Sequence, residues 1–476
     1  MNRIILRDFI AYLPARVVPA LIALAGIPIV TRWLSPAVYG EYLLALTTLT
    51  LIGAFSTSWI VSIIVRFRPI DVNATLASHL RPFVVFSVVG SIAAWLFIGS
   101  VYQGHGGDMW LLLAGCAWIA TYTATEYKIA KYRADEQALR YSLAVCLRSV
   151  GGLLVGIAIV YWVMRSGSML ILGVAIASIF VILSARPRKD VLPHTPKDNP
   201  AFNGRDLVRY AVPIAFSNLF VSALSFGNRY IVEAYWGAEQ VAIYGAAYDI
   251  AERSIFFLNA MMLLSSSVMA IKVFERDGEA AAATMLAALL RFYMLLAGIV
   301  VAGAAVLADP IIWLLLPPSY QAGAIILPIV SVGAVLVGIM HRYSLIFSFH
   351  KRTDIILVCT LVALVANLAA SVIFVSRYGI VGGAIGSLCG YLVWFAAIRW
   401  SVRKFHAPRF PWLSLLRVLL ASCAAGTAMY FVAERSPFAI ILALLAAAVA
   451  YAATLLVTGE ISRRELAALA KFGARS

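Results

Sequence analysis

Long apolar segments, separated by short polar ones, run through the whole chain. A membrane-spanning helix needs about 20 predominantly apolar residues, and the sequence holds about fourteen segments of that length. None alternates in the manner of barrel strands, so helices are predicted. The predicted spans are Ile10–Thr31, Glu41–Val65, Leu80–Tyr102, Met109–Ala130, Tyr141–Val163, Ser168–Ser184, Leu207–Trp236, Val241–Phe274, Ala283–Leu307, Gln321–Phe349, Asp354–Val375, Ile380–Val402, Trp412–Val432 and Phe438–Val457.

A polar stretch rich in Pro, Lys and Asp, residues 185–206, divides these spans into groups. We therefore predict a six-helix lobe over 1–190, a cytoplasmic linker over 191–206, a second six-helix lobe over 207–404, and two further helices with a basic tail over 405–476. The segment Trp33–Tyr42 is echoed by Tyr235–Tyr244 at the corresponding place of the second group. Six is an even number, so the lobes would share one orientation, related by a pseudo-two-fold axis along the membrane normal.

Composition agrees with an all-α integral membrane protein, because 63% of the residues are hydrophobic and only 13% are charged, against about half and a quarter in soluble domains. The net charge of +16 comes from Lys and Arg that gather in alternate loops. That bias places both termini in the cytoplasm and disfavours nucleic-acid binding. The five cysteines lie in apolar runs without metal-ligand or redox spacing, so no metal site or cofactor is expected.

Ionisable residues interrupt two consecutive spans of the second group. A charge inside the bilayer costs several kcal/mol unless it meets a partner or a water-filled cavity. A polar cavity within the membrane explains so many of them, and a cavity suggests transport rather than enzymatic catalysis. The residues concerned are Asn228, Arg229, Glu233, Asp249, Glu252 and Arg253.

Three motifs resemble those of a known family. They are Leu34-Ser-Pro-Ala-Val-Tyr-Gly-Glu-Tyr42, Gly237-Ala-Glu-Gln-Val-Ala-Ile-Tyr244 with Ala247-Tyr-Asp249, and Arg377-Tyr-Gly-Ile-Val-Gly-Gly-Ala-Ile-Gly386. Together they are similar to the polysaccharide-exporter (Wzx-like) branch of the multidrug/oligosaccharidyl-lipid/polysaccharide (MOP) superfamily. The resemblance implies a flippase of the bacterial cytoplasmic (inner) membrane. Such a flippase moves a polyprenyl-pyrophosphate-linked oligosaccharide outward by alternating access, for O-antigen, capsule or exopolysaccharide synthesis.

For that substrate, Arg229, Arg253, Asn228, Tyr248 and Arg16 are the candidate binding residues. Arginine suits a pyrophosphate because its planar donors bind two oxygens and it stays charged, while a tyrosine ring can stack on a sugar. Asp249, Glu252 and Glu233 are expected to pair with the arginines, or to carry H+ or Na+ for coupling. A structural ion-pair network that fixes the helices is the alternative for all the charges, and snorkelling to the interface is the alternative for Arg16.

Residues near predicted cytoplasmic helix ends are given simpler roles. Arg148, Arg291 and Arg342 are expected to anchor at the interface or the inner mouth, and Glu126 and Lys128 to lie on a solvated helical extension. Glycines at four-residue spacing, Gly152/Gly156 and Gly382/Gly386/Gly390, are expected to let helices pack closely.

Other functions stay open at this stage. A drug/cation antiporter of the same superfamily would need a cavity that is acidic on balance, whereas the arginines here offset the acids. A membrane glycosyltransferase or polymerase is disfavoured by the short outer loops, and a non-transporting scaffold of a polysaccharide assembly complex would have a sealed cavity. Membrane lipid and a polysaccharide polymerase are the further partners that the resemblance suggests.

Overall fold

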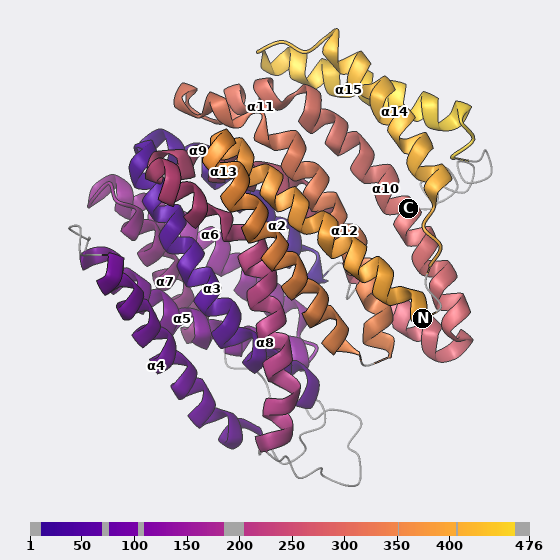
Figure 1. Cartoon of the computed structure of the whole chain (residues 1–476). Coiled ribbons are helices and arrows are strands. Elements are labelled where there is room, and N and C mark those ends of the chain that lie inside the picture. The colour runs from indigo at the N-terminus through magenta and orange to yellow at the C-terminus, as the bar shows by residue number, and fades with distance from the viewer. Residues whose placement is uncertain are drawn as a thin grey trace. The chain divides into compact units, whose positions relative to one another are not determined.

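The computed structural model describes residues 11–68, 76–102, 109–184, 204–350, 352–405 and 408–461, and in them it consists of helices without strands (Figure 1). Ten helical segments of this part are long and apolar enough to cross a membrane, and the shorter α7 is also apolar. The all-α membrane fold class is thereby confirmed, while the total of fourteen spans stays a prediction. The helices are α2 (Pro14–Trp33), α3 (Pro36–Phe67), α4 (Leu76–Tyr102), α5 (Met109–Ala134), α6 (Ala138–Trp162), α7 (Gly167–Leu183), α8 (Gly204–Phe226), α9 (Asn228–Asp277), α10 (Glu279–Val306), α11 (Ala308–Leu315), α12 (Ile326–Phe349), α13 (Thr353–Ser401), α14 (Trp412–Tyr430) and α15 (Pro437–Val457).

Two pairs of predicted spans are joined through glycines with little connecting chain. Gly237 in α9 has φ 80° and ψ 172°, and Gly379 in α13 has φ 59° and ψ −136°. Positive φ is adopted readily by glycine and rarely by other residues. The two turns therefore depend on these glycines, and both lie in the short breaks between predicted spans, at residues 237–240 and 376–379.

The predicted span Leu207–Trp236 is not one continuous helix. It breaks at Gly227, so that α8 ends at Phe226 and α9 begins at Asn228. The amide of Tyr230 donates to the Gly227 carbonyl at 3.1 Å as the new helix starts. The polar residues Asn228 and Arg229 thus stand at the beginning of a helix rather than within one.

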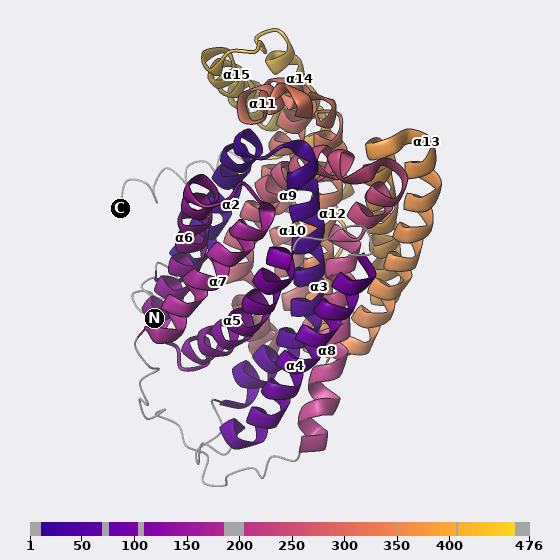
Figure 2. The same ribbon diagram turned by 90° about the vertical axis from the view of Figure 1, so that its left-hand side faces the viewer.

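The described contacts divide the chain into two compact units, one formed by residues 1–245 and 352–394 and the other by 246–351 and 395–476. In the first unit, α7 packs against α5 and α6, and α3 packs against α5 and α8 (Figure 2). In the second unit, α10 packs against α12 and α14, and α14 packs against α15. The lobes predicted from the sequence have other bounds, and they stay a prediction.

Glycines lie where helices approach one another within the first unit, as their spacing predicts. A Cβ atom on Gly173 of α7 would lie 2.3 Å from the Cα of Gly156 on α6. In α13, a Cβ on Gly386 would lie 2.8 Å from the Cα of Ser371, on the other side of the Gly379 turn. The packing role of the predicted α13 glycine Gly386 is confirmed, because only a residue without a side chain fits there. A Cβ on Gly152 or Gly156 would lie 3.1 or 3.3 Å from α7, so these two lie at a close approach that a small displacement could relieve.

Candidate functional site

Arg229 lies in a buried contact between α9 and α3 in the first unit. Arg229 is only 3% exposed, and its Nη1 donates to Thr47 Oγ1 at 3.2 Å. Its guanidinium carbon lies 5.0 Å from the centre of the Phe226 ring. The next residue, Tyr230, shares a 2.5 Å hydrogen bond with Thr48. This pair of contacts ties the start of α9 to α3.

Asn228 is fully buried and its amide is engaged on both sides. Its Nδ2 donates to the Gly383 carbonyl at 3.1 Å and to Ser387 Oγ at 2.8 Å. Its Oδ1 accepts from Ser371 Oγ at 3.0 Å. The partners come from both sides of the α13 turn, so Asn228 holds α9 and the two arms of α13 together.

The two echoed turn segments touch each other in the first unit. A Cβ atom built on Gly40 would lie 1.8 Å from the Ala238 carbonyl oxygen. One built on Gly245 would lie 2.5 Å from Leu43 Cδ1. With the Thr47 and Thr48 contacts to Arg229 and Tyr230, these form one line of close approach between α3 and α9.

Arg253 in the second unit has a different environment. Its Nη2 lies 3.9 Å from Asp249 Oδ2, one helical turn before it, and the exposed fractions of the two side chains are 35% and 7%. Its Nε is buried and has no hydrogen-bond partner among the described residues. A partly accessible guanidinium with a long ion pair and an unused donor is suited to bind an anion.

The remaining candidates differ in exposure. Tyr248 is 1% exposed, so its ring is enclosed in this structure. Arg16 on α2, Glu233 and Glu252 are each half-buried. Arg229 and Glu233 belong to the first unit, whereas Asp249, Glu252 and Arg253 belong to the second. The structure thus pairs Asp249 with Arg253, as their spacing predicts.

Lys128 is not on a solvated extension, and that expectation was wrong. It is 9% exposed, and its ammonium donates to the carbonyls of Val181, Ile182 and Ser184 at 2.9, 3.0 and 2.7 Å. Carbonyls at the end of a helix lack partners within the helix, so Lys128 caps α7. Sequence periodicity around Lys128 carries no signal of a helix end on another segment.

The expectation that Arg342 anchors at the interface or the inner mouth was also wrong, because the residue is buried. It is 2% exposed, and its guanidinium carbon lies 4.0 Å from the centre of the Tyr293 ring. Nη1 donates to Asn259 Oδ1 at 3.3 Å and to the Gly338 carbonyl at 2.5 Å. The one sequence feature that marks this site is Gly338, one helical turn before Arg342.

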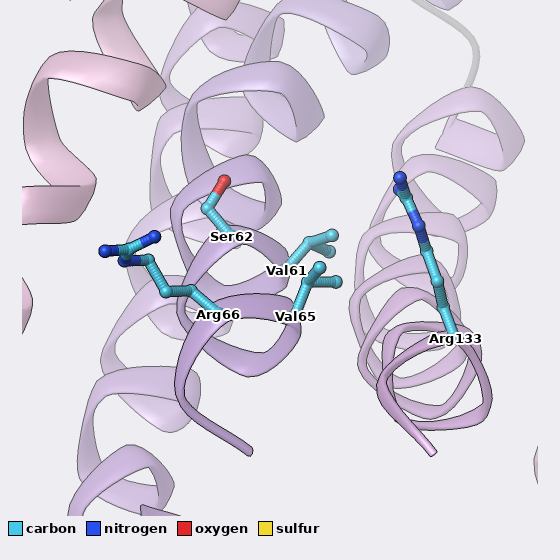
Figure 3. Close-up of a pocket in the computed structure, with 5 residues that line it drawn as sticks. All are labelled: Val61, Ser62, Val65, Arg66 and Arg133. Atoms are coloured by element: carbon cyan, nitrogen blue, oxygen red, sulfur yellow. The ribbon is translucent and has the colours of Figure 1, made fainter. Parts of the chain in front are cut away.

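A cleft opens between α3 and α5 in the first unit (Figure 3). Its volume is about 490 Å³, and it is lined by Val61, Ser62, Val65, Arg66 and Arg133. Figure 3 shows the two valines pointing from α3 toward α5, which carries Arg133, whereas the Arg66 side chain points to the other side of α3. The sequence alone does not indicate it, because its residues come from two separate helices.

Comparison with known proteins adds to this geometry. A family model described as polysaccharide biosynthesis protein matches residues 5–270. No curated protein sequence matches the chain.

Among solved structures, the chain is similar to one described as the lipid II flippase MurJ in an inward closed conformation. The TM-score is 0.71 at 14% identity, over 97% of this chain and 99% of that chain. It is also similar to an inward-facing multidrug resistance MATE family transporter of the MOP superfamily, with TM-score 0.60 at 16% identity over 83% of this chain and 98% of that chain. An outward-facing MATE conformation gives 0.58 at 18%, over 84% and 95%. At these identities the likeness shows the fold.

Proposed function

The chain belongs to the polysaccharide biosynthesis protein family, in the polysaccharide-exporter branch of the MOP superfamily, and from this premise we propose that it is a flippase for a lipid-linked oligosaccharide. The cargo would be a polyprenyl-pyrophosphate-linked repeat unit, moved across the bacterial cytoplasmic membrane for O-antigen, capsule or exopolysaccharide synthesis. The family match over residues 5–270 carries the proposal. A polysaccharide polymerase on the outer side would consume the product.

Arg253 is our first candidate for contact with the pyrophosphate. Its partly exposed guanidinium and unpartnered Nε support that role, since arginine binds phosphate oxygens in pairs. Arg16, half-buried on α2, is the second candidate. Asp249 would hold Arg253 in place between substrates, and with Glu252 it is the candidate for coupling to H+ or Na+.

Asn228, Arg229 and Tyr248 are all buried in this structure, so in this proposal they support the site and do not contact the cargo first. Asn228 and Arg229 are buried and hydrogen-bonded to α13 and α3. Direct contact with cargo would require α9 to leave these partners. Alternating access supplies such a motion, and Glu233, one helical turn after Arg229, would stay beside it when its contacts to α3 are broken.

Translocation of a polyprenyl-pyrophosphate oligosaccharide in proteoliposomes tests the proposal. Arg253→Ala is expected to slow flipping at least tenfold, and Arg253→Lys to restore part of it. The control is Arg276→Ala on the same helix, because Arg276 is 81% exposed and pairs with its neighbour Asp277. Equal flipping by Arg253→Ala and wild type would remove Arg253 from the site. Absence of flipping by wild type, with the cognate glycan and any ion gradient, would overturn the function itself.

A drug/cation antiporter is the second candidate, favoured by one observation. Asp249 is a carboxylate 7% exposed in its side chain, and a buried acid can exchange a proton for a cation. Loading the same proteoliposomes with a fluorescent organic cation separates the two functions. Cation efflux driven by a pH or Na+ gradient and abolished by Asp249→Asn would favour the antiporter.

A further inference from the structure

The connection from α13 to α14, residues 402–411, buries its apolar side chains and exposes its basic ones. It starts as the short helix η4 (Val402–Lys404), and residues 406 and 407 lie outside the described part. The buried residues are Val402, Pro408 and Phe410, and the exposed ones are Arg403, Lys404 and Arg409. The connection therefore presents three cations on a backbone whose apolar side chains are packed against the protein.

Contacts within the second unit hold this connection in place. The Tyr343 hydroxyl of α12 donates to the Pro408 carbonyl at 3.3 Å. The Phe410 ring lies with its centre 6.0 Å from that of Phe395 on α13. A segment that is already fixed loses less conformational freedom when it binds a ligand. The exposed cations are thus carried by an ordered segment that is suited to binding.

No acidic residue offsets these cations nearby in the chain. The sequence contains no Asp or Glu between Asp354 and Glu434. Arg403, Lys404 and Arg409 contact no carboxylate among the described residues. The guanidinium carbon of Arg403 lies 4.8 Å from the centre of the Trp400 ring, and a cation–π contact holds a guanidinium without neutralising its charge. All three cations therefore stay available to an anionic partner.

Large apolar side chains flank the connection at both ends. Trp400 is 68% exposed just before it, and Trp412 and Leu413 are 64% and 61% exposed just after it. Tryptophans of membrane proteins gather at the membrane–water interface, at the level of the lipid headgroups. We therefore expect the connection to lie at the depth of the lipid phosphates, on the side that the distribution of Lys and Arg predicts to be cytoplasmic.

Anionic lipids give the cytoplasmic leaflet a negative surface potential that attracts basic residues. We propose that Arg403, Lys404 and Arg409 bind the phosphates of anionic phospholipids, while Trp400 and Trp412 lie among the same lipids. The exposed tryptophans favour a lipid partner over an acidic protein. Each cation meets its own headgroup, so the three need not converge on one phosphate. The surface goes beyond the transport function, since lipid binding is measured without cargo.

Native mass spectrometry of the full chain in detergent tests the surface, with phosphatidylglycerol and phosphatidylcholine as probes. Wild type is expected to retain phosphatidylglycerol in preference to phosphatidylcholine. The Arg403→Ala/Lys404→Ala/Arg409→Ala triple variant should weaken phosphatidylglycerol binding at least tenfold, because one basic residue near an anionic surface contributes about fivefold, or about 1 kcal/mol. The Arg403→Lys/Arg409→Lys variant keeps the charge and should stay within about twofold of wild type.

The matched control removes the same charge from the first unit. Its substitutions are Arg81→Ala, Arg133→Ala and Arg209→Ala, at exposed arginines near helix ends of the first unit. It should stay within about twofold of wild type. Equal weakening by the two triple variants would show a diffuse effect of net charge and overturn the proposal, as would equal retention of the two lipids by wild type.

A further competition experiment distinguishes the two sources of lipid phosphate. Phosphatidylglycerol should be displaced by excess phosphatidylglycerol at least as well as by a polyprenyl pyrophosphate. Stronger competition by the polyprenyl pyrophosphate, lost in the Arg403→Ala/Lys404→Ala/Arg409→Ala variant, would reassign the surface to the lipid carrier of a cargo and overturn the phospholipid assignment.

Discussion

Arginines in the apolar helices of this chain differ in what surrounds the guanidinium. Arg229 and Arg342 are 3% and 2% exposed, and each donates to uncharged oxygens of neighbouring segments. The Arg253 side chain is 35% exposed, and the carboxylate of Asp249 lies 3.9 Å from it. Burying a charge is tolerated only when most of its donors are satisfied, so Arg229 and Arg342 act as anchors. The Nε atoms of both Arg342 and Arg253 are buried without a partner among the described residues, so it is its larger exposure that makes Arg253 the one of these three most open to a ligand.

Asn228 at the start of α9 should contribute more to the stability of the fold than an exposed polar residue such as Ser376 of α13. Asn228→Ala removes three hydrogen bonds and leaves buried partners on Gly383, Ser387 and Ser371. We expect the free energy of unfolding in detergent to fall by about 1 to 3 kcal/mol, the cost of an unsatisfied buried polar group. Denaturant titration followed by circular dichroism measures it.

The control for Asn228 is Ser376→Ala, because the exposed Ser376 hydroxyl donates only to the Ile373 carbonyl of its own helix, at 2.9 Å. Its free energy of unfolding should stay close to that of wild type. Equal stability of the two variants would show that the Asn228 network contributes nothing.

At the scale of elements, the α14–α15 hairpin is fastened to the rest of the second unit at both ends. Glu460 accepts from Arg291 Nε at 2.6 Å and from Arg417 Nη1 at 3.1 Å. Tyr451 donates to the Leu295 carbonyl at 2.6 Å, and Arg435 meets Asp309 at 2.8 Å beyond the other end. The hairpin is thus held to α10 and α11 by charge as well as by apolar packing.

The carboxyl group of Glu460 makes the stability of this attachment depend on pH. Burial raises the pKa of its carboxyl, but hydrogen bonds from Arg291, Ser414 and Arg417 outweigh burial, so the pKa is lowered from the ordinary value of 4.5. A carboxyl with a lowered pKa stabilises the fold above its ordinary pKa, and the contribution is lost as pH falls through the folded value. Wild type should therefore lose stability below about pH 4.5.

Glu460→Gln removes that contribution at every pH. We expect a loss of about 1 to 3 kcal/mol at pH 7, smaller than for a fully buried pair because Arg291 and Arg417 are about one-third exposed. Thermal unfolding at pH 7 and at pH 4 measures it, and the variant should show a smaller difference between the two pH values than wild type. Asp309→Asn, at the exposed pair with Arg435, is the control and should change stability much less.

The helical type of the elements was predictable from apolar length, and the breaks at Gly237 and Gly379 from glycine position, whereas the break of the predicted span Leu207–Trp236 at Gly227 was not. The partners of single charged residues were not. Lys128 caps a helix more than fifty positions later, and such a pairing leaves no periodicity in the sequence. The Asp249–Arg253 contact was predictable because it is local, one helical turn long.

At the scale of the whole molecule, the fold and the family agree with the resemblance carried by the three motifs. The family model shows the polysaccharide biosynthesis protein family, and the chain is similar in fold to a lipid II flippase and to MATE transporters, in agreement with the polysaccharide-exporter branch of the MOP superfamily that the motifs suggest. The motifs identify the fold well because they contain turn and packing glycines, such as Gly40, Gly237 and Gly386. For the same reason the motifs say little about the cargo. Recognition of the cargo depends on which polar residues are exposed, and a sequence pattern does not indicate exposure.

The contact between the echoed turns yields a prediction about motion. A Cβ on Gly40 would lie 1.8 Å from the Ala238 carbonyl oxygen, so Gly40→Ala must push α3 away from α9. If alternating access separates these segments, the variant should favour the separated state. A Thr48→Cys reporter, 7% exposed in wild type, placed in a chain whose native cysteines are replaced by serine, should then react at least several-fold faster with a membrane-impermeant maleimide. Gly90→Ala is the control, since a Cβ there meets nothing within 4 Å. Faster labelling in both variants would indicate general loosening, and unchanged labelling in Gly40→Ala would show that these turns do not part during transport.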